Sequence, residues 1–167
     1  MIAIVNVDEN WGIGRDGDQP FYIPGDLKFF KEKTEGKTVI MGRATFDALP
    51  PNARPLPKRE NVVLTRQSDL KIEGVTICNS FDDLKAYASN DAFVIGGADV
   101  YKNLLPYCTK AYVTKTFADG VCDRWFENLD EMPNWKLIEK SEMYEYDSIK
   151  FQFCTYVNER AVEFNGD

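Results

Sequence analysis

Apolar runs and polar, amphipathic stretches alternate along most of the chain. Runs rich in β-branched residues are bounded by polar, glycine or proline residues, as buried strands are, and they span residues 2–7, 38–41, 61–65, 75–78, 92–95 and 111–116. Helical spacing predicts helices at residues 25–34, 44–49, 81–88 and 98–105. Because parallel neighbouring strands need crossover connections, this order predicts an α/β domain with a mainly parallel sheet.

The pattern changes after Pro133. Residues 135–144 and 148–157 are long apolar and aromatic runs, and with residues 145–147 between them they predict a hairpin. Its antiparallel strands would extend one edge of the sheet. The predicted fold is a central, mainly parallel twisted sheet with an antiparallel C-terminal hairpin and about four flanking helices. Residues 1–158 are expected to form a single domain, and the polar tail 159–167 to be frayed.

Composition narrows the class of protein. A chain of 167 residues, 44% of them hydrophobic, is long enough for one sizeable core. Its formal net charge of −7 disfavours nucleic acid and anionic membranes as partners, since both reward a basic surface. The chain shows no signal-peptide pattern and no apolar stretch of transmembrane length, so we expect a cytoplasmic protein. We also expect a monomer, although the sequence carries no direct signal of oligomeric state.

The chain has no histidine, and its four cysteines, at positions 78, 108, 122 and 154, are widely spaced. A zinc site would need all four thiolates to converge, so we expect no metal and free thiols in a reducing compartment. In so acidic a protein, an anionic ligand must meet a local group of arginines or lysines.

Residues 12–17 match the G-x-G-x-x-G fingerprint of dinucleotide-binding sites. That fingerprint requires a helix to begin at the third glycine, and Pro20 and Pro24 prevent a helix before residue 25. We therefore interpret residues 9–24 as a long loop that covers or contributes to a binding site. An ordinary surface excursion is the alternative.

Three predicted strand ends carry groups that suit an anion. Gly96 and Gly97 follow one strand, and their lack of side chains lets a phosphate or a ring approach the backbone. Arg43 and Thr45 follow a second strand at a helix start, and Arg66 follows a third. A tight turn and an exposed loop arginine are the alternatives, but together the three ends favour a phosphorylated ligand.

Asp26 opens the first predicted helix among aromatic, aliphatic and proline neighbours. Phe30 lies one turn later on the same face and Leu27 lies beside it, so the carboxylate is expected in an apolar setting that perturbs its pKa. The alternative is a helix-start carboxylate that satisfies free backbone N–H groups. On this stretch alone the alternative is favoured, whereas the preceding loop and the anion-ready strand ends favour the first interpretation.

Several motifs, taken in order, resemble those of dihydrofolate reductases, the NADPH-dependent enzymes that make tetrahydrofolate. They cover about residues 1–126 in the family's spacing, and the C-terminal hairpin also fits. The ordered set is highly specific, although no single motif is decisive. The matching segments are Ile13-Gly14-x-Asp16-Gly17, Pro20-x-x-x-Pro24-x-Asp26-Leu27-x-x-Phe30, Val39-Ile40-Met41-Gly42-Arg43-x-Thr45-Phe46, Arg54-Pro55-Leu56-Pro57-x-Arg59-x-Asn61, Val94-Ile95-Gly96-Gly97 with Val100-Tyr101, and Tyr112-Val113-Thr114.

The resemblance implies a dihydrofolate site around Asp26. Asp26 would pair with the pterin's 2-amino group and adjacent ring nitrogen, and would favour protonation of the imine nitrogen through water. Thr114 would hydrogen-bond Asp26 and the substrate, while Arg59 would hold the glutamate α-carboxylate. The other implied substrate contacts are Val5, Phe21, Leu27, Phe30, Leu49, Leu56 and Tyr101.

The resemblance also implies an NADPH site. Hydride transfer from nicotinamide needs no protein nucleophile, which is consistent with a chain lacking histidine. The loop 9–24 would close over the nicotinamide, and Gly96–Gly97 would be a cis peptide. The implied cofactor contacts are Ile13, Gly14, Gln19, Arg43, Ala44, Thr45, Leu64, Thr65, Arg66, Ile95, Gly96, Gly97, Ala98, Val100 and Tyr101.

The chain departs from the family pattern in places. Phe21 replaces a tryptophan whose indole N–H would hold a water near the substrate, which bears on proton delivery. Asp99 replaces a basic residue near the adenosine phosphate, which bears on the preference for NADPH over NADH. Cys122 and Arg124 replace glycine and threonine in the loop 119–126, which bears on its coupling to the active-site loop. Residues 50–53 are a short insertion beside the benzoyl-glutamate end.

Two other functions fit parts of the pattern. One is a reductase of the same fold acting on a pyrimidine or another pterin, which would have no need for Arg59. The other is a folate- or NADPH-binding module without turnover, against which the retained Asp26 argues.

Overall fold

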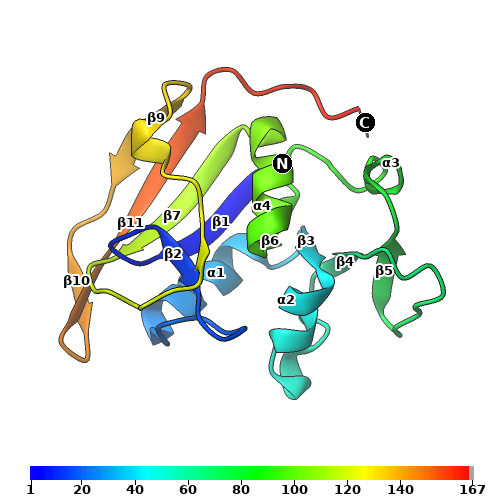
Figure 1. Ribbon diagram of the computed structural model, residues 1–167, viewed down its shortest axis with the longest axis horizontal. Coiled ribbons are helices and arrows are strands. Elements are labelled where there is room, and N and C mark those ends of the chain that lie inside the picture. Colours follow the sequence, from blue (N-terminus) through cyan, green and yellow to red (C-terminus); the bar gives the residue numbers. More distant parts are fainter. Residues whose placement is uncertain (166–167) are drawn as a thin grey trace.

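The computed structural model describes residues 1–165 and places most of the strands in one nine-stranded sheet (Figure 1). Its strand order is β10 (Tyr144–Tyr146), β11 (Ile149–Asn158), β7 (Lys110–Thr116), β1 (Ile2–Val7), β6 (Phe93–Gly96), β3 (Thr38–Gly42), β4 (Glu60–Leu64) and β5 (Val75–Cys78), with β9 (Trp135–Lys140) also paired to β11. From β7 to β5 all pairs are parallel, whereas the pairs of β11 are antiparallel. The predicted fold class is therefore confirmed.

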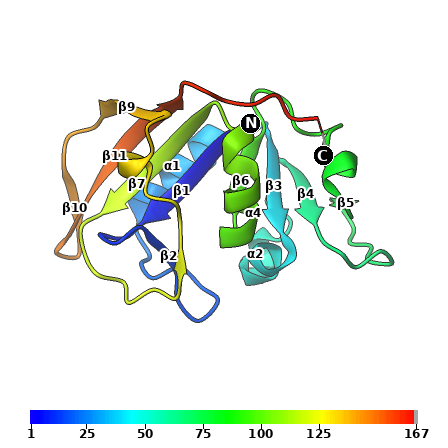
Figure 2. The ribbon, with the colours of Figure 1, turned by 45° about the horizontal axis from the view of Figure 1, so that its top comes forward.

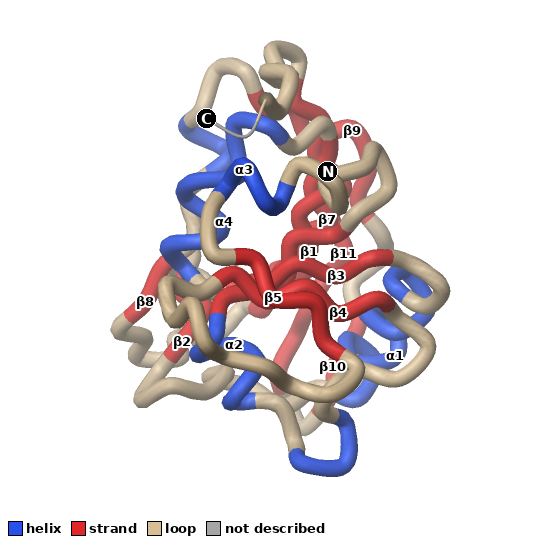
Figure 3. Tube along the Cα trace, turned by 90° about the vertical axis from the view of Figure 1, so that its right-hand side faces the viewer, coloured by secondary structure: helices blue, strands red, loops and turns tan. Residues whose placement is uncertain are grey.

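Helices lie on both sides of this sheet. Seen from its edge, α1 (Pro24–Thr34) lies on one side, and α3 (Phe81–Leu84) and α4 (Ala98–Leu104) lie on the other (Figure 3). The arrowheads of β1, β3 and β4 point to the end of the molecule where α2 (Arg43–Ala48) and β2 (Gly12–Gly14) lie (Figure 2). Single turns of 3-10 helix are present at η1 (Pro51–Ala53), η2 (Leu105–Tyr107) and η3 (Leu129–Glu131).

Two core clusters follow from the alternation of side chains along each strand. In β1, Val5 and Val7 belong to the larger cluster, which also holds Leu104 of α4. Ile4 belongs to the smaller cluster, against which Phe29 of α1 packs. The two faces of β1 therefore look toward different helices, and the face shared with α1 is the one that carries the candidate site.

The structure departs from the predicted elements at α3 and at the hairpin. The helix α3 ends at Leu84 rather than residue 88, because the chain turns there and packs Tyr87 and Ala88 against the larger cluster. The first arm of the hairpin divides into β9 and β10, and Ser141 between them bonds to the backbone of Phe153. The turn falls at residues 147–148, both in the left-handed region that tight two-residue hairpins require.

The polar tail is attached to the body as far as it is described. Residues 159–165 form no helix or strand, but the Val162 N–H donates to the Pro106 carbonyl at 3.0 Å. Phe164 makes edge contacts with Phe81 and Tyr107, at centroid distances of 6.4 and 5.1 Å. The expectation of a frayed tail is therefore wrong for these residues, because an aromatic anchor holds them; residues 166–167 lie outside the described part.

The buried core gives a test of this packing. Leu104 has no exposed surface, so Leu104→Ala should lower the free energy of unfolding by about 2–5 kcal/mol through lost burial and a cavity. Leu137→Ala is the matched control, since that side chain is 43% exposed and its loss should cost about 0.5 kcal/mol or less. Urea denaturation followed by circular dichroism measures both, and equal losses would contradict the assigned burial.

Candidate active site

Asp26 lies in the first turn of α1, where Pro24 presets the backbone for the helix start. Its carboxylate bonds to the sheet rather than to the helix end. Thr114 Oγ1 donates to Oδ1 at 2.6 Å, and Asn6 Nδ2 donates to Oδ2 at 2.9 Å. The helix-cap interpretation is therefore wrong, and Asp26 links α1 to β7 and β1.

The environment of Asp26 perturbs its acidity. Burial raises the pKa of Asp26, because an ionised carboxylate loses hydration, and the hydrogen bonds from Thr114 and Asn6 offset this only in part. The carboxyl group thus keeps a proton to a higher pH than a free aspartate. A carboxyl with a raised pKa beside hydrogen-bond donors is a typical setting for binding a ligand or directing a proton.

Asn6 is the site residue that the sequence analysis missed. It lies opposite Thr114 in the parallel register of β1 and β7, and its Oδ1 accepts a 2.7 Å hydrogen bond from Thr116. The available signal was alternation: Ile2, Ile4 and Asn6 share one face of β1, so a polar residue follows two apolar ones there.

The predicted substrate contacts divide between the two faces of the sheet. Val5 packs in the larger cluster on the face opposite Asn6, as does Tyr101, whose hydroxyl donates to the Ile4 carbonyl at 2.7 Å. Leu27 and Phe21 are partly buried. Three of the apolar contacts instead pack in the smaller cluster near α1, together with the cofactor candidate Ile95, and these are Phe30, Leu49 and Leu56.

Arg59 is held beside these apolar residues. Its Nε donates to the Pro57 carbonyl at 2.9 Å, and its Nη1 donates to Thr34 Oγ1 at 3.0 Å. The guanidinium carbon lies 5.9 Å from the centroid of the Phe30 ring. Burial lowers the pKa of Arg59, opposed by the charge of Glu35, but arginine remains charged, so it can pair with an anionic group of a ligand.

The glycine pair lies at the carboxyl end of β6, next to α2. Gly96–Gly97 is a cis peptide, as the resemblance implied. A Cβ atom on either glycine would lie 3.3 Å from Thr45 Oγ1, which leaves no room for a side chain without displacement. A Cβ on Gly42 would meet Val100 at 3.2 Å. Bare backbone and the Thr45 hydroxyl therefore meet where β3 and β6 end.

The two arginines of the strand ends differ in their surroundings. Arg43 Nε lies 3.0 Å from an Asp47 carboxylate oxygen, and its Nη1 donates to Gln67 at 3.1 Å. Arg66 is exposed, and the neighbouring Thr65 hydroxyl accepts from the Gln67 backbone at 3.2 Å. Gln67 therefore joins the β4 end to the α2 start. The remaining predicted cofactor contacts on these elements are Ala44, which is exposed, and Leu64 and Ala98, which are partly buried.

The loop 9–24 is tied down by a small second sheet. β2, which carries Ile13 and Gly14, pairs antiparallel with β8 (Arg124–Trp125), while Gln19 further along is exposed. Asp123 donates from its N–H to the Gly14 carbonyl at 2.8 Å and accepts from the Asp16 N–H at 3.1 Å. The two loops are therefore coupled, and Cys122 and Arg124 do not prevent it.

Asp8 anchors both loops through backbone hydrogen bonds. Its buried carboxylate accepts from the Gly12 N–H at 2.6 Å and from the Gly120 N–H at 2.9 Å, and the Cys122 thiol lies 3.5 Å away. Burial opposes ionisation, but the backbone hydrogen bonds from Gly120, Gly12 and Asn10 outweigh it and lower the pKa of Asp8. Sequence reasoning missed this residue also.

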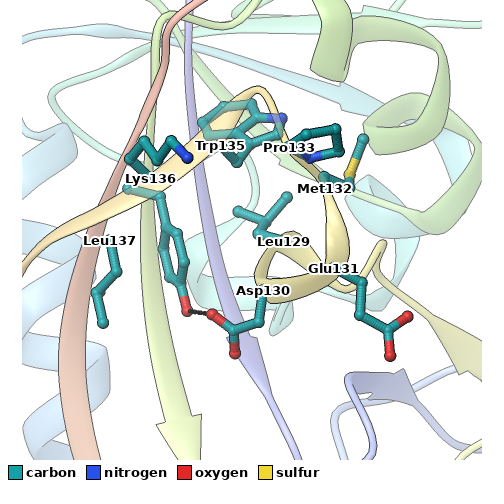
Figure 4. Close-up of a pocket in the computed structure, with 9 residues that line it drawn as sticks. Leu129, Asp130, Glu131, Met132, Pro133, Trp135, Lys136 and Leu137 are labelled. Atoms are coloured by element: carbon teal, nitrogen blue, oxygen red, sulfur yellow. Dashed lines mark hydrogen bonds between the residues drawn. The ribbon is translucent and has the colours of Figure 1, made fainter.

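A separate surface hollow lies away from these residues (Figure 4). It is formed by η3, the start of β9 and Tyr156, whose hydroxyl donates to Asp130 at 2.7 Å. None of the predicted site residues lines it. Within residues 1–165, no group of three or more His, Cys, Asp or Glu side chains is placed to hold a metal ion, and no helix is long and apolar enough to cross a membrane.

Together these features define a class of protein. A partly buried carboxylate stands beside apolar and aromatic side chains, and arginine, threonine and bare glycine backbone stand at neighbouring strand ends. The carboxylate suits ring N–H groups and the strand ends suit phosphates. This combination is that of an oxidoreductase that draws hydride from a nucleotide cofactor.

Comparison with known proteins gives the family. A family model described as dihydrofolate reductase matches residues 1–158. The dihydrofolate reductase of Bacillus subtilis is 38% identical over 174 residues, covering 99% of this chain and 99% of that protein. That of Mycobacterium tuberculosis is 47% identical over 116 residues, covering 69% and 71%. The chain therefore belongs to the dihydrofolate reductase family.

A solved structure agrees with this assignment. The dihydrofolate reductase from Enterococcus faecalis, complexed with NADP(H) and RAB-propyl, superposes with a TM-score of 0.82 at 35% identity, covering 94% of this chain and 95% of that one.

Proposed function

We propose that this chain reduces 7,8-dihydrofolate to 5,6,7,8-tetrahydrofolate with NADPH, and so supports one-carbon metabolism and thymidylate synthesis. The observation that carries the proposal is the Asp26 carboxylate, partly buried at the start of α1 and held by Thr114 and Asn6. Ionised, it accepts from the pterin 2-amino group and the adjacent ring N–H. Its charge orients the ring and favours protonation of the imine nitrogen through water.

The apolar residues and Arg59 account for the rest of the substrate. Phe30, Leu49 and Leu56 offer apolar surface to the pterin and benzoyl rings and exclude water. Arg59 is fixed through Nε and Nη1, so its remaining N–H donors can meet the glutamate α-carboxylate. The partly buried Leu27 and Phe21 would add apolar surface, and Thr114 can accept from the substrate as well as donate to Asp26.

The residues at the strand ends fit NADPH. The absence of side chains at Gly96 and Gly97 lets a flat ring or a phosphate approach the backbone, and Thr45 adds a hydroxyl there. Arg43 and Arg66 supply positive charge for the pyrophosphate and the 2′-phosphate, with Thr65 beside them. When bound, the nicotinamide supplies the hydride. The protein's part is to position the rings, hold charge and exclude water.

The loop 9–24 would cover the reacting rings. Its pairing with β8 and the Asp123 contacts hold Ile13 and Gly14 at one place above the sheet. Release of product requires these contacts to loosen, so loop opening is proposed to limit turnover.

Arg59 favours dihydrofolate over a pterin or pyrimidine without glutamate. The partly exposed Arg59 guanidinium is held beside the Phe30 ring with N–H donors to spare, which suits the carboxylate of a glutamate and has no use with a substrate that lacks one. A binding module without turnover would not need the raised pKa of Asp26, which is itself costly at neutral pH.

The functional unit is proposed to be the single domain 1–158, acting as a cytoplasmic monomer. All four cysteines are free thiols, which supports a reducing compartment. Sedimentation velocity at micromolar concentration should give one species near 19.1 kDa, and a species of twice that mass would contradict the monomer.

Asp26→Asn should lower the rate of NADPH oxidation with dihydrofolate at neutral pH by about 10²-fold or more, because the neutral amide cannot favour substrate protonation. Activity should recover partly in acid, where the substrate is already protonated. Absorbance at 340 nm across the pH range measures this. Asp91→Asn is the control, since that exposed carboxylate pairs with Lys37; unchanged neutral turnover in Asp26→Asn would remove Asp26 from the mechanism.

Arg59→Gln should raise KM for dihydrofolate by about tenfold to a hundredfold, the loss expected for a hydrogen-bonded charge pair. A dihydropterin without glutamate should be reduced by the variant as well as by the native protein. Lys58→Gln removes a neighbouring exposed charge and controls for long-range electrostatics. Equal losses for both substrates would show that Arg59 does not recognise the glutamate.

A further inference from the structure

A strip of three polar side chains crosses β1 and β7 beneath Asp26. Asn6 lies opposite Thr114 in the register, and Thr116 lies two residues further along β7 on the same face. Elsewhere this face carries Ile4 and Tyr112, which pack in the smaller core cluster. Polar groups there are costly unless they are hydrogen-bonded, and all three are bonded within the strip or to Asp26.

The hydrogen bonds of the strip run in one direction. A threonine hydroxyl has one proton, and Thr116 gives its proton to Asn6 Oδ1 at 2.7 Å. With Oδ1 engaged, the amide presents Nδ2 to Asp26 Oδ2 at 2.9 Å. Thr114 gives its single proton to Oδ1 of the same carboxylate at 2.6 Å. If the amide were reversed, its oxygen would face the Asp26 carboxylate and Thr116 would lose its acceptor, so Asp26 and Thr116 together set the orientation of Asn6.

We propose that Asn6, oriented by Thr116, is a positioning residue that fixes the Asp26 carboxylate so that each oxygen keeps one acceptor site for the two N–H donors of the pterin. A carboxylate oxygen accepts about two hydrogen bonds. Thr114 occupies one acceptor site on Oδ1 and Asn6 occupies one on Oδ2, so one acceptor site remains free on each oxygen for the pterin. The inference rests on the proposed role of Asp26.

The other charged groups near Asp26 do not take this role. Lys115 points to the opposite face of β7, where it lies 5.3 Å from the Trp11 ring and pairs with Asp130. Asp8 is bonded to the loop backbone, and Lys28 on α1 is exposed. The Tyr101 hydroxyl is buried behind the sheet on the Ile4 carbonyl. Asn6 is thus the neutral donor that acts on Asp26 from β1.

Asn6→Ala should lower kcat/KM for dihydrofolate at neutral pH by about tenfold, the effect of losing one hydrogen bond to a charged group. The loss should lessen in acid, and carboxyl NMR of the ligand-free protein should show Asp26 titrating at higher pH. Thr116→Val, nearly isosteric, should shift both readouts in the same direction. The double variant should lose little more than Asn6→Ala alone, since Thr116 acts through Asn6.

Asn134→Ala controls for removal of an amide, because Asn134 bonds to Asn158 and not to the site. Comparing the melting temperatures of the two variants separates loss of stability from loss of positioning. An Asp26 titration and kcat/KM unchanged in Asn6→Ala would overturn the proposal, and so would fully additive losses in the double variant. The NMR titration needs no substrate. A native protein inactive with dihydrofolate would therefore refute the proposed function separately.

Discussion

The carboxylate of Asp26 joins the start of α1 to the central strands β1 and β7. This link requires polar side chains on the strands at that point. An ionised group withdrawn from water needs hydrogen-bond donors, and Thr114 and Asn6 provide them. Their presence places polar side chains on a sheet face that is otherwise apolar. The aromatic packing of Phe29 on Phe153, 4.4 Å between centroids, holds α1 against the sheet beside this interruption. The same contacts between α1 and the sheet therefore position the Asp26 carboxylate and hold the helix in place.

The ends of β3, β4 and β6 differ from the Asp26 region, because they offer hydrogen-bond donors and bare backbone in place of an acid. In the proposed function the ligand groups there are anionic, and the side chains fit this: they are absent at Gly96 and Gly97 and are donors at Thr45 and Arg66. The overall charge of −7 makes this local concentration of donors the main source of attraction for phosphates. On the proposed function, a partly buried acid in one part of the site and open donors in another would let one short chain hold two dissimilar ligands.

The sequence contained much of the fold and part of the site. Strand and helix periodicity located the parallel core, and Pro24 located the start of α1 almost to the residue. Resemblance paired Asp26 with Thr114. It did not indicate Asn6, although alternation along β1 offered a weak signal. It also missed Asp8 and the pairing of β2 with β8, because these contacts join segments more than a hundred residues apart and leave no local pattern. The aromatic attachment of Phe164 was missed because composition alone marked the tail as polar.

Two carboxylates thus sit close in sequence with acidities moved in opposite directions. Burial raises the pKa of Asp26, while backbone donors lower that of Asp8. On acidification Asp26 gains its proton first, and Asp8 stays ionised and keeps hold of Gly12 and Gly120. The stability contributed by Asp8 is lost only as pH falls through its lowered pKa. Asp26 and the Asp8 anchor of the two loops therefore change protonation over separate ranges of pH, so Asp26 can be protonated while the loops stay attached.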